Sequence, residues 1–294
     1  MVPGQRGTVC VSRRAAVLGH PISHSKSPAL HTAAYAKLGV DIGYSAIDVT
    51  VAGLPAFMES LRAEDSWCGL SVTMPLKSAM VREVDEVRGA GALLGVINTV
   101  VFEYDGGAVR RAGYNTDVAG IVESVRYAGV ATTPHAAILG GGGTSAAAVA
   151  AVHELGADHV DVFVRDAGRA GDAEAAAAAV GISLSVRPLT EAATAVAGTD
   201  LVISTFPPRA ADDLAEELAA LPGTGAGVLL DVAYDPWPSR IAETWRGHGG
   251  AVVPGLEMLM YQAAEQIRLF SGCDVDTAVI DVMCDSVGLP RRVF

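Results

Sequence analysis

Hydroxyl, amide, lysine and carboxylate groups gather in three short clusters within the first 117 residues. The first holds Ser25 and Ser27, whose hydroxyls point the same way in an extended segment because the two residues alternate along it. The second is the stretch 71–77, which runs into a proline and ends on a lysine. The third combines residues 98–99 with 113–117. Each cluster lies where a predicted strand ends, and open α/β sheets bind ligands at that edge. The clusters therefore predict a binding site for a small polyhydroxylated molecule.

A glycine-rich turn near the middle of the chain is typical of a phosphate site. A short apolar run is followed by Gly140, Gly141, Gly142, Gly143 and Thr144, and then by an alanine-rich helical pattern. Glycines let the backbone approach a ligand closely, and the free N–H groups and positive dipole end of a helix attract an anion. The spacing satisfies G-x-G, while Ser145 takes the place of the third glycine of G-x-G-x-x-G. We interpret the turn as a dinucleotide-binding site.

The residues after the next predicted strand bear on the choice of cofactor. An acidic residue at that strand end suits the ribose of NAD, whereas arginine suits the 2′-phosphate of NADP. Here Arg165 follows the strand and Arg169 lies one turn further on, so two guanidinium groups can bind one phosphate. Asp166 would repel that phosphate. The pattern favours NADP and leaves NAD as the less favoured alternative.

Strand and helix patterns alternate in the front half of the chain. Ser27 before Pro28 predicts a helix N-cap, and Gly39 predicts the end of the same helix. Such alternation is typical of an α/β layer with a mostly parallel sheet. The predicted strands are 14–19, 44–50, 68–74, 95–103 and 110–115, and the predicted helices are 29–38, 54–62 and 80–94.

The back half of the chain predicts a complete doubly wound sheet. Its pattern contains six strands, most of them separated by helices, and a dinucleotide-binding domain of this kind needs six strands with crossovers. After the glycine turn, strands are expected at 159–164, 182–189, 200–206, 227–234 and 251–254, with helices at 172–180, 192–197, 212–221 and 239–246. The last forty residues follow a different pattern, with two helices at 256–270 and 275–287 and no strand between them.

Composition limits the classes of partner. The chain has 294 residues, half of them apolar, which suits two domains with sizeable cores. The net charge of −12 argues against nucleic acid or an anionic membrane surface as the main partner. There is no run of 18 apolar residues, so no transmembrane helix is expected. A small-molecule substrate is the expected partner.

The cysteines and histidines show no metal-binding pattern. His20 and His24 flank Pro21 and so cannot share a helix face. The four cysteines, which have neither a C-x-x-C nor a zinc-like spacing, are Cys10, Cys68, Cys273 and Cys284. We expect no metal, structural thiols in a reducing compartment, and a cytoplasmic location.

Taken together and in order, these motifs resemble the shikimate dehydrogenase family over nearly the whole chain. The residues that carry the resemblance are GHPISHSKSP at 19–28, SVTMPLK at 71–77, NT at 98–99, NTD at 115–117, GGGGTS at 140–145 and GLEMLMYQ at 255–262.

The resemblance implies an α/β fold of two domains. Residues 1–116 and 256–294 would form the substrate-binding and catalytic domain, and residues 117–255 a Rossmann NADP domain. It also implies reversible NADP-dependent reduction of 3-dehydroshikimate to shikimate, on the route to chorismate and the aromatic amino acids. Monomer and homodimer both remain open.

The resemblance also implies roles for individual residues. Lys77 would be the acid/base and Asp117 its partner. Ser25 and Ser27 would bind the substrate carboxylate. The residues expected to bind the ring hydroxyls are Thr73, Asn98, Asp117 and Gln262. Tyr234 would approach the substrate. Val232 and Gly255 would lie near the nicotinamide.

Three positions depart from the family pattern. Ser71 replaces an asparagine often found two residues before the threonine, and Val164 and Asp166 replace the outer residues of the usual Asn-Arg-Thr at the 2′-phosphate. The departures at Val164 and Asp166 weaken the prediction of the cofactor more than the prediction of the substrate.

The chemistry is consistent with a dehydrogenase. Moving hydride from a secondary alcohol to a nicotinamide requires removal of the hydroxyl proton, which a lysine near a carboxylate can perform. The nearest alternative is a quinate/shikimate or aminoshikimate dehydrogenase, possibly using NAD. A non-catalytic ligand-sensing relative should lack Lys77 or Asp117, and both are present. The serine pair does not suit a methylene-tetrahydrofolate dehydrogenase-like enzyme.

Overall fold

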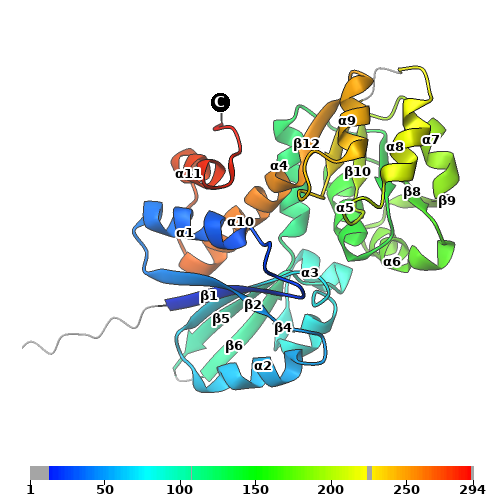
Figure 1. Ribbon diagram of the computed structural model, residues 1–294. Helices are drawn as coiled ribbons and strands as arrows, with labels where there is room; N and C mark the ends of the chain where they lie inside the picture. Colours follow the sequence, from blue (N-terminus) through cyan, green and yellow to red (C-terminus); the bar gives the residue numbers. More distant parts are fainter. Residues whose placement is uncertain (1–12, 107, 224–226, 293–294) are drawn as a thin grey trace, which may run out of the picture.

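Two β-sheets lie side by side, each with helices packed on it, and the chain passes between them twice (Figure 1). The computed structural model describes residues 13–106, 108–223 and 227–292, so Cys10 lies outside the described part. The two sheets confirm the predicted α/β class.

The first sheet has the strand order β2-β1-β3-β5-β6-β4. Three of its five pairings are parallel, namely β1–β2, β1–β3 and β4–β6, and the other two are antiparallel, so the sheet is mixed. The antiparallel part arises because β5 runs opposite to both of its neighbours, β3 and β6. The strands are β1 (Arg13–Gly19), β2 (Ile42–Asp48), β3 (Trp67–Val72), β4 (Glu86–Val87), β5 (Thr99–Asp105) and β6 (Ala108–Tyr114).

Helices cover both faces of this sheet, with α1 and α10 on one side and α2 on the other (Figure 1). The helical elements of the front half are α1 (Ser27–Leu38), α2 (Leu54–Ser60), α3 (Ala90–Leu94) and the 3₁₀ turns Leu61–Ala63 and Ala79–Glu83.

The single helix predicted at 80–94 is wrong. In its place the chain forms a 3₁₀ turn, the short strand β4 and the short helix α3. Val84 is extended, with a φ of −110° and a ψ of 156°. The amide of Asp85 donates to the carbonyl of Arg111 at 2.9 Å, and Arg88 donates to Gly113. Pairing with the open edge of β6 therefore outweighs the local helical pattern.

The second sheet confirms the doubly wound prediction. All its pairings are parallel, and its order is β12-β11-β10-β7-β8-β9. The strands are β7 (Ala136–Leu139), β8 (His159–Val164), β9 (Ser183–Pro188), β10 (Leu201–Ser204), β11 (Val228–Asp231) and β12 (Ala251–Pro254). The associated helices are α5 (Gly143–Glu154), α6 (Gly171–Val180), α7 (Ala192–Ala195), α8 (Asp212–Ala219) and α9 (Arg240–Gly247), with 3₁₀ turns at Ala167–Arg169 and Leu189–Glu191.

Two helices connect the two halves of the molecule. Helix α4 (Asp117–Tyr127) carries the chain towards the second sheet, and α10 (Gly255–Ser271) brings it back, so that α11 (Thr277–Val287) packs on α1. Helices α4 and α10 pack closely at Gly120, where a Cβ atom would lie 2.8 Å from the carbonyl oxygen of Met258. Their crossing fixes the position of the site residues that they carry.

Within residues 13–106, 108–223 and 227–292, no helix is both long enough and apolar enough to cross a membrane. In the same part of the chain, no group of histidine, cysteine and carboxylate residues is arranged to hold a metal ion.

Candidate active site

A cavity of about 400 Å³ opens between the two sheets. Residues from both halves of the molecule line it. The first half and α10 contribute Ser27, Thr73, Lys77, Asn98, Asp117 and Gln262, and the second half contributes Thr144, Val232, Tyr234 and Gly255. The cavity therefore brings together most of the polar residues predicted from the sequence, beside the glycine-rich turn.

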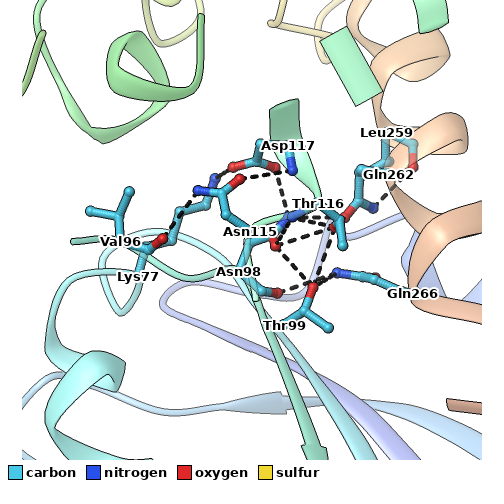
Figure 2. Close-up of polar contacts among 10 residues, drawn as sticks. All are labelled: Lys77, Val96, Asn98, Thr99, Asn115, Thr116, Asp117, Leu259, Gln262 and Gln266. Carbon is cyan, nitrogen blue, oxygen red and sulfur yellow. Dashed lines mark hydrogen bonds and ion pairs between the residues drawn. The ribbon is translucent and has the colours of Figure 1, made fainter. Parts of the chain in front are cut away.

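Lys77 and Asp117 form an ion pair in the wall of this cavity (Figure 2). The Nζ of Lys77 donates to Oδ2 of Asp117 at 2.5 Å. Lys77 lies beyond β3, where its carbonyl accepts from the amide of Ile97, and Asp117 is the first residue of α4. Forty residues separate the two in sequence, and the fold brings them into contact.

Asn98 holds the other oxygen of the same carboxylate. Its Nδ2 donates to Oδ1 of Asp117 at 2.8 Å and lies 3.3 Å from Oε1 of Gln262. Its Oδ1 accepts from the backbone amide of Thr116 at 2.8 Å. Because both carboxylate oxygens have a donor and Asp117 is almost fully buried, the negative charge beside Lys77 has one orientation.

The serine pair lies at the start of α1. Ser27 is buried and lines the cavity, while Ser25 is half-buried and is not among the lining residues. The prediction that Ser27 caps α1 is wrong. Lys26 stands at the N-cap position in a helical conformation, and the Ser25 hydroxyl accepts from the Ser27 amide at 3.3 Å. The Ser27 side chain is therefore not used as a helix cap.

The glycine-rich turn has the shape needed to admit a phosphate group. Gly140 has a φ of +107°, and a Cβ atom on Gly141 would lie 2.3 Å from the carbonyl oxygen of Arg169, so side chains are excluded at both positions. At Gly142 and Gly143 a Cβ would meet nothing within 4 Å, which leaves open space in front of α5. The N-cap residue of this helix is Gly142, which has no side chain to occupy the helix start. These residues fit a dinucleotide pyrophosphate.

Arg165 and Arg169 lie on the surface after β8. The Arg165 guanidinium lies over the ring of Phe206 at 5.7 Å and donates to the carbonyl of Ala210 at 3.5 Å. Asp166 accepts from the amide of Gly168 at 2.9 Å and so caps the 3₁₀ turn that follows. Its carboxylate therefore has a local structural role, which explains how an acidic residue can stand between the two arginines.

Val232 and Gly255, predicted to lie near a nicotinamide, are in contact. A Cβ atom on Gly255 would lie 2.2 Å from the carbonyl oxygen of Val232. Asp231, at the end of β11, is buried and accepts from the Ser239 hydroxyl at 2.5 Å. Burial raises the pKa of Asp231, and the Ser239 hydrogen bond opposes that rise. Asp231 thereby anchors the segment that presents Val232 and Tyr234 to the cavity.

Sequence reasoning missed one cavity residue that is nearly inaccessible to solvent. Gln266 is 1% exposed and bonds to Ser71, Thr99 and Asn98. The signal was present, because Gln266 stands four residues after Gln262 and so lies on the same face of α10.

The match to known proteins extends over most of the chain. Residues 17–100 match the family described as Shikimate dehydrogenase substrate binding domain, and residues 255–281 match Shikimate 5′-dehydrogenase C-terminal domain. A protein of Rubrobacter xylanophilus named shikimate dehydrogenase (NADP(+)) is 36% identical over 270 residues, which cover 90% of this chain and 92% of that protein. The chain belongs to the shikimate dehydrogenase family.

Solved structures of family members have the same fold. The crystal structure of Mycobacterium tuberculosis shikimate dehydrogenase superposes with a TM-score of 0.81 at 36% identity, covering 94% of this chain and 98% of the other. The Thermus thermophilus enzyme in complex with NADP(H) and shikimate gives a TM-score of 0.77 at 30% identity, covering 93% and 99%. The resemblance inferred from the sequence motifs is confirmed.

Proposed function

We propose that this protein is an NADP-dependent shikimate dehydrogenase, which interconverts 3-dehydroshikimate and shikimate. The observation that carries the proposal is the Lys77–Asp117 pair at 2.5 Å, in the wall of a cavity shared by the polar clusters and the dinucleotide half. Family membership supports the same activity. In this reading, residues 1–116 and 256–294 bind substrate, and residues 117–255 bind the cofactor.

Lys77 moves the proton in this mechanism. When shikimate is oxidised, the unprotonated amine takes the proton of the reacting hydroxyl, and in the reverse direction the ammonium returns it to the developing alkoxide. Asp117 holds Nζ at a fixed point and stabilises the ammonium state. A nicotinamide held beside Val232 and Gly255 would supply the hydride chemistry.

The other residues predicted from the sequence would hold the substrate, and all of them except Ser25 line the cavity. Ser25 and Ser27 would bind the carboxylate through their hydroxyls. Thr73, Asn98 and Gln262 would bind the ring hydroxyls, because each offers a hydroxyl or amide group beside the cavity. Tyr234 would approach the substrate from the second half of the molecule, and burial raises the pKa of its phenol.

The second half of the molecule binds the cofactor. The turn from Gly140 to Thr144 would hold the pyrophosphate, and Val232 with Gly255 would face the nicotinamide. Arg165 and Arg169 would bind the 2′-phosphate, a role supported by their exposure and by the engagement of Asp166 in its own turn.

A steady-state assay with two substrates and two cofactors tests the proposal. Shikimate and quinate are each assayed with NADP⁺ and with NAD⁺, and kcat/KM is expected to be highest for shikimate with NADP⁺. A preference for quinate with NAD⁺ would instead support the related quinate dehydrogenase activity, for which Asp166 is the structural argument. No turnover of either substrate would overturn the proposal.

A further inference from the structure

A directed chain of hydrogen bonds leads from Tyr44 to Asp117, and Figure 2 shows its second part, from Gln266 onward. The Tyr44 hydroxyl donates to Ser71 at 2.7 Å, and the Ser71 hydroxyl donates to Oε1 of Gln266 at 2.7 Å. Nε2 of Gln266 donates to the Thr99 hydroxyl at 2.9 Å. The Thr99 hydroxyl in turn donates to Oδ1 of Asn98 at 2.9 Å, and Nδ2 of Asn98 donates to Asp117.

The direction of this chain is fixed at Gln266. Its Nε2 faces the backbone carbonyl of Asn98 at 3.2 Å, and a carbonyl can only accept, so the amide cannot be reversed. Its Oε1 accepts from Ser71 and lies 3.3 Å from Nε2 of His31. All four hydrogen-bonding positions of the amide are therefore occupied, in a place that is closed to solvent.

His31 reinforces this arrangement from the far side. It is fully buried, and burial lowers its pKa to about 3, so the ring is neutral and carries one N–H. Because it faces Oε1 of Gln266, which can only accept, Nε2 carries that proton, and Nδ1 accepts from the Tyr35 hydroxyl at 3.0 Å. The His31 ring also stacks on Tyr44 at 3.9 Å.

We propose that Gln266 is a positioning residue for the dehydrogenase reaction. By linking Ser71 to Thr99 and Asn98, its amide fixes the orientation of the Asp117 carboxylate and hence of Lys77. Gln266 touches no reacting atom, and it acts through Asn98. This inference rests on the proposed function, because it concerns proton transfer in the same site.

The test measures kcat and KM for shikimate with NADP⁺ in variants that break the chain at two links. Gln266→Met keeps the approximate shape but removes every hydrogen bond, and Gln266→Glu places an acceptor against the Asn98 carbonyl. Thr99→Val interrupts the chain one step further on and provides a second test if a Gln266 variant does not fold. In folded variants kcat should fall about tenfold or more, because misplaced catalytic groups slow the chemical step. KM should change less, since Ser27 and Gln262 remain in place.

A matched control and a double mutant separate positioning from general destabilisation. Glu265→Gln alters the neighbouring residue on the exposed side of α10 and should keep wild-type kcat. In an Asp117→Asn background, Gln266→Met should have less than about a threefold further effect, because groups acting as one unit are non-additive.

Three results would decide against the inference. Wild-type kcat in folded Gln266→Met or Thr99→Val would overturn it while leaving the proposed function intact. Effects of Gln266→Met and Asp117→Asn that multiply would also overturn it. A wild-type enzyme that does not turn over shikimate would overturn both the inference and the proposed function.

Discussion

At the scale of single residues, the geometry of Lys77 makes a prediction about rate. If Lys77 transfers the proton, Lys77→Ala should lower kcat by about 10²–10⁴-fold, the usual contribution of a positioned acid or base. Asp117→Asn should also lower kcat, because it removes the charge that holds Nζ at 2.5 Å. Stopped-flow and steady-state measurements of NADPH formation by the Lys77→Ala and Asp117→Asn variants check these two predictions. A near-normal kcat with a raised KM in Lys77→Ala would make this lysine a binding residue only.

A second prediction at this scale concerns cofactor choice. Arg165→Ala should weaken NADP⁺ binding by roughly tenfold or more, since a charged hydrogen bond to phosphate contributes about 1.5–3 kcal/mol. NAD⁺ affinity should stay the same, because NAD⁺ has no 2′-phosphate. Titrations of both cofactors by calorimetry test this. As a control, replacing the exposed Arg209 by alanine should leave the ratio of NADP⁺ to NAD⁺ affinity unchanged. If this ratio is also unchanged in Arg165→Ala, Arg165 does not belong to the proposed 2′-phosphate site.

At the scale of elements, local patterns predicted the second sheet well and the first sheet less well. Strands β7, β10, β11 and β12 each carry a short apolar run, helices separate the strands of this half, and a parallel crossover follows from that alternation. The failure at 80–94 has a different cause, because β4 exists only through its pairing with Ala112 and Gly113 of β6. A two-residue strand defined by its partner has no pattern of its own in the sequence.

The same reasoning explains which site residues the sequence could indicate. Lys77, Asn98 and Asp117 stand in short motifs whose residue types suggest chemistry before any fold is known. The importance of Gln266 depends on a contact with Ser71, which lies 195 positions away. Only the crossing of α10 over the first sheet brings these two side chains together.

Helix α1 carries a prediction about pH. His31 has an ordinary pKa of 6.5, and burial lowers it to about 3 in the folded protein. Between these values the unfolded chain binds a proton that the native state excludes, so the free energy of unfolding falls as pH decreases, by roughly 1.4 kcal/mol per pH unit. From pH 7.5 to 5.0 His31 should account for a loss of about 2 kcal/mol.

Urea unfolding at the two pH values measures this contribution. His31→Gln cannot titrate, so its stability should depend less steeply on pH than that of the wild type, even if its stability at pH 7.5 is lower. His153→Gln, which changes an exposed histidine of α5, should keep the wild-type slope. Equal slopes in His31→Gln and the wild type would show that the buried ring does not control acid stability.

At the scale of the whole molecule, an arginine near the C-terminus joins the elements that connect the two sheets. The Arg292 side chain is fully buried, and its guanidinium pairs with Glu257 at the start of α10. It lies 4.3 Å from the ring centre of Tyr127 in α4 and 5.1 Å from that of Tyr261 in α10. Its backbone amide donates to Asp281 of α11 at 3.0 Å. The side chain of Arg292 thus ties α4 to α10, and its backbone amide adds the contact with α11, beside the crossing that positions Asp117 and Gln262.

Arg292→Ala should therefore destabilise the whole molecule. Removing one partner of a buried ion pair leaves the other charge uncompensated, which costs about 3–5 kcal/mol, and the contacts with both tyrosine rings are lost as well. Arg291→Ala provides a matched control, because its pair with Asp285 is exposed and should contribute less than about 1 kcal/mol. Urea unfolding of the two variants compares them directly. The double variant Arg292→Met with Glu257→Gln should recover part of the loss, since it leaves no unpaired charge. Equal stability of Arg292→Ala and Arg291→Ala would show that this arginine does not hold the connecting helices together.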